Sequence, residues 1–126
     1  MPNTFPAKLQ GISRLKKAFG YSVQGLRLAW QHEEAFRLEF YILIMGIPLA
    51  GLIGKNTIDY VLLIGSLLLL IVIELINSAI EAICDKISLA NDELIGRSKD
   101  FGAAAVFIAI IGTLGIWAVV LTENWL

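Results

Sequence analysis

The sequence contains few charged residues and only one cysteine. Charged residues make up 17% of its 126 residues, against about 25% in ordinary soluble domains, while 57% of the residues are hydrophobic. A soluble chain of this length cannot bury so much apolar surface, because small domains hide only a modest fraction of their surface. A single cysteine excludes a disulfide framework and any site built from several cysteines. The composition therefore indicates an integral membrane protein.

Basic residues are not in excess either, with 10 Lys and Arg residues against 11 Asp and Glu residues. This balance argues against a nucleic acid as the main partner, because nucleic-acid binding requires a strongly basic face. The glycine-rich phosphate-binding loop that ends in Gly-Lys-Ser/Thr is also absent from the sequence. A nucleotide site of that common type is thus excluded.

Three apolar stretches are long enough to cross a membrane as helices, since a spanning helix needs about 20 mostly apolar residues. Residues 101–122 carry no charge, and residues 35–53 and 58–84 contain only isolated charges. We therefore expect an all-α integral membrane fold with three transmembrane helices over these ranges. Pro48, inside the first of them, predicts a kink or a local break.

The basic residues predict how these helices cross the membrane. Lys55 lies between the first two spans, and the other nine of the 10 basic residues lie in or beside segments on the opposite side. The side richer in Lys and Arg is normally cytoplasmic. We expect a multi-pass protein with a cytoplasmic N-terminus.

A basic amphipathic segment precedes the first span, over residues 8–30. Its apolar residues recur at spacings of three and four, and its basic residues occupy other faces of the helical wheel. A helix of this kind lies in the membrane interface with its basic side toward lipid phosphates. Gly11, Gly20 and Gly25 weaken the pattern, so we expect one interrupted helix or two short ones. An anchor without chemistry is the alternative interpretation.

Four polar residues follow one another along the second span and its end: Glu74, Asn77, Glu81 and Asp85. At about 100° per residue they share one narrow stripe of a helix that descends to the cytoplasmic surface. Charged groups inside a membrane are costly, which makes them functional candidates. Carboxylates and an amide suit a hard cation and a proton acceptor. A polar seam between packed helices, or an ion path, stays open on these residues alone.

Two further polar clusters flank the spans. The cluster at the cytoplasmic mouth of the first span consists of Glu33, Glu34, Arg37 and Glu39. Before the third span, Lys99 could meet an anionic phosphate, or Arg97 and Lys99 could serve orientation alone while Asp100 caps the helix. Small residues along the third span, Gly102 among them, indicate close helix packing rather than a site.

Four runs of the sequence resemble the signature of the small prokaryotic diacylglycerol kinases. They are GYSVQGLR at 20–27, WQHEEAFRLE at 30–39, ELINSAIEAICD at 74–85 and GRSKDFGAAAV at 96–106. The resemblance extends from about residue 14 to the end of the third span. It implies a homotrimer of three-span protomers in the bacterial inner membrane. It also implies transfer of the γ-phosphoryl group of ATP, with Mg²⁺, to diacylglycerol, which yields phosphatidic acid.

The resemblance assigns roles to three residues of the polar stripe and to one residue at the mouth of the first span. Glu74 matches the family's proton acceptor, and Asn77 matches an amide beside it. Glu33 and Glu81 match the carboxylates that bind Mg²⁺ and ATP. Because phosphoryl transfer asks a protein mainly for positioning and charge neutralisation, two carboxylates together with the substrate phosphates are enough for the metal.

Further matches concern the nucleotide and the lipid. Lys99 and Asp100 match residues at the nucleotide phosphates, and Arg14 and Tyr21 match ATP contacts from the surface helix. The residues that match the family's lipid contacts are Arg14, Ala35, Phe36, Arg37, Leu38, Glu39, Glu74 and Ala103. A protomer this small implies a site shared between subunits.

Four positions depart from the common pattern of the family: Glu34, Leu38, Asp92 and Ala103. They bear on the lipid head group and on contacts to the nucleotide base, not on the reaction. The nearest alternative is a sibling kinase that acts on undecaprenol with the same fold. An ion- or proton-conducting bundle and a non-catalytic scaffold are alternatives of another class, although neither would need Lys99, Asp100 or the basic segment.

Overall fold

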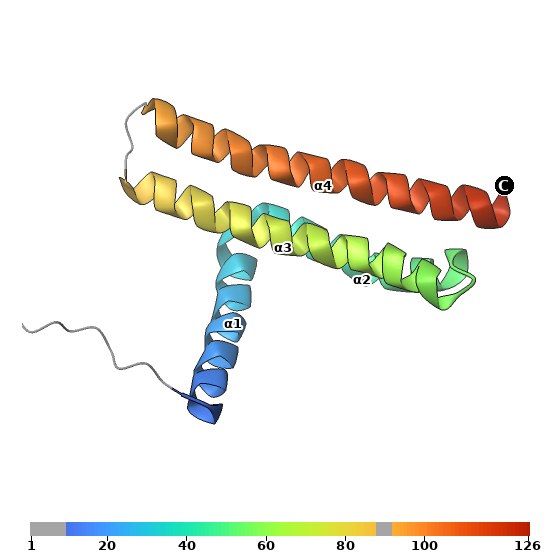
Figure 1. Cartoon of the computed structure of the whole chain (residues 1–126), viewed down its shortest axis with the longest axis horizontal. Helices are drawn as coiled ribbons and strands as arrows, with labels where there is room; N and C mark the ends of the chain where they lie inside the picture. Colours follow the sequence, from blue (N-terminus) through green and yellow to red (C-terminus); the bar gives the residue numbers. More distant parts are fainter. Residues whose placement is uncertain (1–9, 88–91) are drawn as a thin grey trace, which may run out of the picture. The chain divides into compact units, whose positions relative to one another are not determined.

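The computed structural model describes residues 10–87 and 92–126. These residues form four helices: α1 (Ile12–His32), α2 (Glu34–Ile53), α3 (Thr57–Ile87) and α4 (Glu93–Trp125), as Figure 1 shows. No strand occurs in these two ranges, so the expected all-α fold is confirmed. The chain divides into two compact units, one with α1 and the other with α2, α3 and α4.

The first unit contains a single uninterrupted helix of 21 residues. The expected interruption is therefore wrong: Gly20 and Gly25 lie inside α1, and only Gly11, just before it, has a positive φ of 63°. A glycine inside a helix costs about 1 kcal/mol but keeps its backbone hydrogen bonds, so good helix formers around it can carry the helix through. Residues 8 and 9, the start of the predicted segment, lie outside the described residues.

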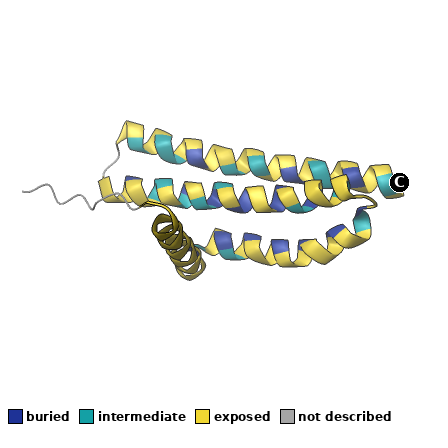
Figure 2. Ribbon diagram, turned by 60° about the horizontal axis from the view of Figure 1, so that its bottom comes forward, coloured by how far each residue is buried: buried dark blue, intermediate teal, exposed yellow. Residues whose placement is uncertain are grey.

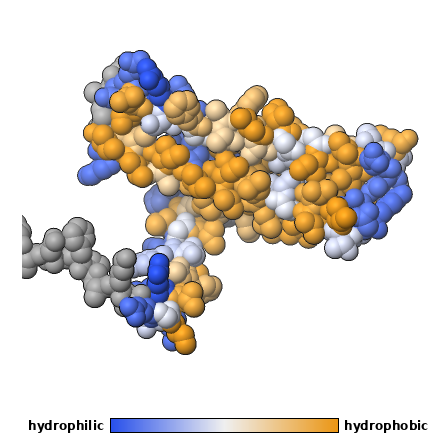
Figure 3. Space-filling model, viewed as in Figure 1, coloured by the Kyte–Doolittle hydropathy of each residue, from blue (hydrophilic) through white to orange (hydrophobic). Residues whose placement is uncertain are grey.

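The three helices of the second unit are each long and apolar enough to cross a membrane, as the sequence predicted. They have 20, 31 and 33 residues, which at 1.5 Å per residue gives lengths of about 30, 47 and 50 Å. The hydrocarbon core of a bilayer is about 30 Å thick, so α3 and α4 extend beyond it. In Figure 3 the middle of these helices is hydrophobic and their ends carry hydrophilic residues.

Pro48 lies inside α2, which continues beyond it to Ile53. A break at this proline is therefore not observed, because proline removes one backbone hydrogen bond while the bonds of its neighbours are kept. The buried face of α2 runs through residues spaced three and four apart. They are Phe36, Glu39, Leu43, Gly46 and Ala50.

The helix α3 contacts both α2 and α4, whereas α2 and α4 meet at few points (Figure 2). Its inner face is buried along most of its length, and two polar residues, Glu74 and Asn77, belong to that face. The apolar core lies near the turn between α2 and α3, where Ala50, Leu63 and Val120 from the three helices pack together. The second half of α3 thus buries polar groups where the first half buries mainly leucines.

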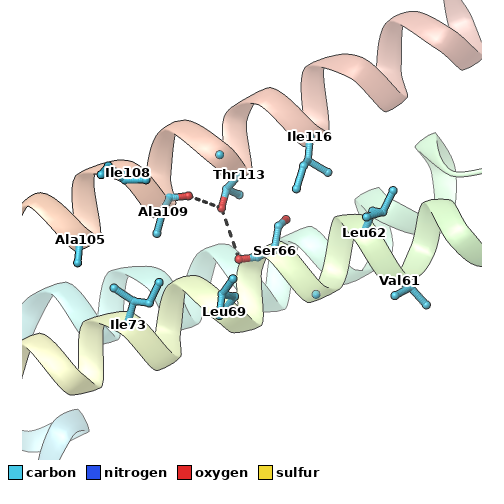
Figure 4. Close-up of a pocket in the computed structure, with 12 residues that line it drawn as sticks. Val61, Leu62, Ser66, Leu69, Ile73, Ala105, Ile108, Ala109, Thr113 and Ile116 are labelled. Carbon is cyan, nitrogen blue, oxygen red and sulfur yellow. Dashed lines mark hydrogen bonds between the residues drawn. The ribbon is translucent and has the colours of Figure 1, made fainter.

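Two hydrogen bonds fix α4 against α3 near the middle of the helices. The hydroxyl oxygen of Thr113 lies 2.8 Å from the carbonyl oxygen of Ala109 and 3.4 Å from the carbonyl oxygen of Ser66 (Figure 4). The single hydroxyl hydrogen is shared between these two acceptors. The indole nitrogen of Trp117 donates to the carbonyl oxygen of Leu63 at 3.2 Å. A cavity of about 450 Å³, lined mostly by apolar and small residues, lies beside the first of these contacts.

A polar network, which we call the outer network, joins the three helices at their other end. The side-chain amide of Asn124 donates to the Asp59 carboxylate and to the carbonyl oxygen of Ile53, both at 2.9 Å. The indole of Trp125 donates to the same carbonyl at 2.9 Å. Lys55 donates to the Asn124 carbonyl oxygen at 2.7 Å and lies 4.7 Å from the centre of the Trp125 ring. The end of α4 is thereby tied to the end of α2.

Candidate functional site

The helix α3 carries the polar stripe into the interior of the second unit. Glu74 and Asn77 are 6% and 7% exposed, Glu81 is half-buried, and Asp85 is exposed. Because Glu74 and Asn77 continue the same face as the buried leucines, the helix points them at its neighbours rather than at lipid. A carboxylate buried on a membrane-spanning helix is costly, which makes Glu74 a candidate functional residue.

Hydrogen bonds join members of this stripe to each other. The amide nitrogen of Asn77 donates to Oε1 of Glu81 at 3.2 Å. The carboxylate of Glu74 accepts a hydrogen bond from Ser78, one turn further along α3. Among the described residues, the buried Oδ1 of Asn77 has no hydrogen-bond donor. The stripe thus combines the oriented carboxylate of Glu81, the buried carboxylate of Glu74 and the amide oxygen of Asn77, which lacks a donor among the described residues.

The start of α2 brings two more carboxylates to the same place. Glu33 occupies the N-cap position of α2 and is half-buried. Within the described residues, its side chain accepts no capping hydrogen bond from the first turn of α2. Its charge and that of Glu81 lie close enough to Glu74 to repel it. Glu39 is 8% exposed, lies near enough to Glu74 to interact with its charge, and has an oxygen, Oε2, without a partner in the described part of the chain.

The helix α4 contributes a cation at the end of the stripe where Asp85 lies. The ammonium group of Lys99 lies 2.6 Å from the Asp85 carboxylate, and both side chains are about half exposed. Arg97 pairs instead with Glu93 of its own helix at 2.7 Å. Asp100 is exposed and lies inside α4. A partly exposed ion pair can exchange its carboxylate for another anion at little cost.

Asp100 is not the N-cap of α4, so one of the two interpretations of this cluster is wrong in that respect. The cap is Asp92, whose carboxylate accepts from the backbone N–H groups of Leu94 at 2.9 Å and Ile95 at 3.1 Å. The helix begins this early because Asp92 satisfies its first free N–H groups and Glu93 suits its positive end. The segment with Lys99 and Asp100 is therefore helical, which sets the direction in which each side chain points.

The other residues matched to the lipid lie at the mouth of the second unit or on α4. Phe36 is buried, Arg37 is half-buried, and Ala35 and Leu38 are exposed. Ala103 is exposed on α4. Arg14 and Tyr21 belong to α1, in the other unit, and both are exposed.

The carboxylates at the mouth fit a magnesium ion in chemistry. Hard cations of this size take carboxylate oxygens together with substrate phosphates and water. Within residues 10–87 and 92–126 no three His, Cys, Asp or Glu side chains gather into a complete metal cage. Glu33 and Glu81, whose charges both act on Glu74, are carboxylates of the kind that a metal–nucleotide complex takes as ligands.

Sequence reasoning missed two residues that shape this site. Asp92 was noted only as a departure from a pattern, although an aspartate before a glutamate and an apolar pair is itself a helix-start signal. Gly102 was counted among small packing residues, but it lies directly against the side chain of Asn77. No signal within α4 alone could have revealed that partner.

Comparison with known proteins gives a consistent result. Residues 20–121 match the family described as prokaryotic diacylglycerol kinase. The chain is 45% identical over 115 residues to a diacylglycerol kinase of Escherichia coli K12, which covers 91% of this chain and 94% of that protein. It is 40% identical over 114 residues to one of Haemophilus influenzae, with 90% and 97% covered, and 38% identical over 111 residues to one of Pseudomonas aeruginosa, with 88% and 90% covered.

Proposed function

This chain belongs to the prokaryotic diacylglycerol kinase family, and we propose that it phosphorylates diacylglycerol with ATP to give phosphatidic acid. The observation that carries the proposal is the buried carboxylate of Glu74, on the core face of a membrane-spanning helix and surrounded by further carboxylates. A buried base on a membrane-spanning helix suits the hydroxyl group of a membrane lipid better than that of a soluble acceptor.

Glu74 is the proton acceptor in the proposed reaction. The lipid hydroxyl oxygen attacks the γ-phosphorus of ATP, its proton passes to the Glu74 carboxylate, and the bond from the γ-phosphorus to the bridging oxygen of ADP breaks. The Ser78 hydroxyl, which donates to Glu74, and the neighbouring Asn77 hold this region of α3 in place. A positioned base of this kind contributes about 10²- to 10⁴-fold to a rate.

Glu33 and Glu81 hold Mg²⁺ together with the phosphates of ATP in this proposal. The metal ion, when bound, neutralises charge on the phosphates during transfer. Glu81 is already oriented, because its Oε1 accepts a hydrogen bond from the amide of Asn77. A divalent cation held by Glu33 and Glu81 would offset the repulsion that each of them exerts on Glu74.

We propose that Lys99 and Asp100 of α4 contact the nucleotide. For Arg14 and Tyr21, which belong to the other unit, the same role rests on the family resemblance alone. The ion pair between Lys99 and Asp85 is partly exposed, so a phosphate group can replace Asp85 as the partner of the ammonium group. Asp85 is then free to face solvent, where its charge is well hydrated.

The lipid enters from the side of α2. An apolar cavity of about 510 Å³ lies between α2, α3 and α4, with Glu39 at one end and Trp117 at the other. Lipid contacts are proposed for the residues named by the family resemblance: Arg14, Ala35, Phe36, Arg37, Leu38, Glu39, Glu74 and Ala103. A groove with apolar walls and a carboxylate at its cytoplasmic end suits a chain with a hydroxyl-bearing head.

The protein acts as a homotrimer in the inner membrane, with its N-terminus in the cytoplasm. This part of the proposal is supported by the distribution of basic residues and by the limited burial of the spans, of which 17%, 39% and 11% are buried within one chain. Further copies of the chain can cover these helices and supply carboxylates across the interface.

The experiment that tests the function offers two lipids to the purified chain. The full-length protein in lipid bilayers receives γ-labelled ATP and Mg²⁺ with diacylglycerol, with undecaprenol, or with neither. Label in phosphatidic acid is the expected result, and it should vanish when EDTA removes the metal. Label only in the undecaprenol product would show that the chain is an undecaprenol kinase and not a diacylglycerol kinase. Label in neither lipid would refute a lipid kinase.

A further inference from the structure

Gly102 is a buried glycine on the face of α4 that meets the polar stripe of α3. A Cβ atom built on it would overlap Oδ1 of Asn77 and would lie 3.2 Å from Cγ of Asn77 and 3.8 Å from Cδ1 of Ile80. By contrast, Gly112 of the same helix has no described neighbour within 4 Å of such a Cβ atom. Only at Gly102 does the absence of a side chain permit the contact between α4 and a site residue.

The contact confines the Asn77 amide between two groups. Its Oδ1 rests against the backbone of Gly102, and its Nδ2 donates to Oε1 of Glu81 at 3.2 Å. In the part of the chain that the structure describes, Oδ1 has no N–H or O–H donor, and it occupies the space that a Cβ atom at position 102 would fill. Because the amide is planar and rigid, a group that displaces Oδ1 also moves Nδ2 away from Glu81.

The packing of α4 at Gly102 extends to the ion pair next to it. Lys99 precedes Gly102 by three residues and therefore lies on the same face of α4, where it pairs with Asp85 of α3. Asn77 and Asp85 are eight residues apart and share a face of α3. The two helices thus meet at two successive points, of which the deeper one requires a residue without a side chain.

We propose that Gly102 is a positioning residue of the nucleotide site. It acts through Asn77, whose amide it confines so that the Glu81 carboxylate is held in one orientation for the metal–nucleotide complex. The inference rests on the proposed function, in which Glu81 binds Mg²⁺ and ATP. It adds a residue that touches neither the nucleotide nor the metal and whose effect passes through one identified side chain.

The test compares Gly102→Ala with Gly112→Ala, a matched control that adds the same methyl group to an open position of the same helix. Both full-length variants are reconstituted, and two quantities are measured: the Kd for the magnesium complex of a non-hydrolysable ATP analogue, and the KM for diacylglycerol. We expect Gly102→Ala to raise the Kd at least tenfold and to leave the KM for diacylglycerol within twofold. Gly112→Ala should change neither by more than twofold.

A double-mutant cycle with Asn77→Ala identifies the path of the effect, because side chains that act through one another are not additive. In the Asn77→Ala background the overlap is gone, so Gly102→Ala should change the Kd by less than twofold. An unchanged Kd for the single variant Gly102→Ala, or an equal loss in both backgrounds, would overturn the proposal.

If Gly102→Ala alone does not fold, the double variant decides. Recovery of a folded oligomer with the Kd of Asn77→Ala supports the proposal, and a misfolded double variant refutes the path through Asn77. These binding measurements do not depend on turnover. If the wild-type chain binds the analogue but labels neither lipid, the proposed function is refuted. The role of Gly102 is then still decided by the Kd values of the variants.

Discussion

Replacement of Glu74 by glutamine should separate the chemistry of the site from its fold. The amide has almost the shape of the carboxylate, and its oxygen can still accept the hydrogen bond from Ser78. The change also removes the repulsion that Glu74 feels from Glu33 and Glu81. We therefore expect the free energy of unfolding to change by less than about 1 kcal/mol, in either direction, since one hydrogen bond contributes about that much.

The rate of lipid phosphorylation should fall far more. Loss of a positioned general base costs about 10²- to 10⁴-fold, which corresponds to about 3–5 kcal/mol in the activation free energy at 1.36 kcal/mol per factor of ten. The assay follows phosphatidic acid from γ-labelled ATP in reconstituted Glu74→Gln and in Glu123→Gln, a control at an exposed glutamate near the end of α4. Turnover of Glu74→Gln within fivefold of the wild type, in a protein shown to be folded, would refute its role as the base.

Three other outcomes follow from the same site. Glu33→Gln or Glu81→Gln should weaken binding of the Mg²⁺–ATP analogue complex about tenfold or more by titration calorimetry, while Glu74→Gln should not; an equal loss in all three would mean that the roles are divided wrongly. Oligomers reassembled from Glu33→Gln and Glu74→Gln chains should regain part of the activity if one site draws on two subunits, and no rescue in proven mixed oligomers would refute the sharing for this pair. Asn124→Ala removes two hydrogen bonds of the outer network, one of them to Asp59, and should lower the free energy of unfolding by about 1–3 kcal/mol in denaturant titrations; unchanged stability would show that these bonds contribute nothing.

The sequence predicted the helices well because a membrane leaves a chain few choices. Long apolar runs must satisfy their own backbone hydrogen bonds, so residues 101–122 could only be a spanning helix or part of one. The expectation failed where local signals compete. The helix α4 begins at Glu93 because Asp92 caps it, and α1 passes through Gly20 and Gly25 because the cost of a glycine is smaller than the gain of the surrounding turns.

The arrangement of the site was only partly predictable. The burial of Glu74 and Asn77 follows from the period of α3, since both fall on the stripe of its buried leucines. The pairings across helices do not follow, because they depend on the axial register between α3 and α4. The contact of Gly102 with Asn77, and that of Lys99 with Asp85, are set by hydrogen bonds such as that from Trp117 to Leu63, more than 50 residues apart in the chain.

The outer network holds the end of α2 that lies opposite Glu33, and its geometry therefore affects the position of Glu33. The helix α2 is about 30 Å long, and its far end is fastened to α4 by the two bonds that the Ile53 carbonyl accepts from Asn124 and Trp125. When α2 tilts about this end, its other end moves most. A tilt of about 5° displaces the end with Glu33 by about 2.6 Å. That distance exceeds the length of a bond between a carboxylate oxygen and Mg²⁺, about 2.1 Å. If Glu33 and Glu81 hold Mg²⁺ as proposed, residues at the opposite end of the helices therefore influence the spacing of these two carboxylates, and through it the affinity for the metal, without touching the metal, the nucleotide or the lipid.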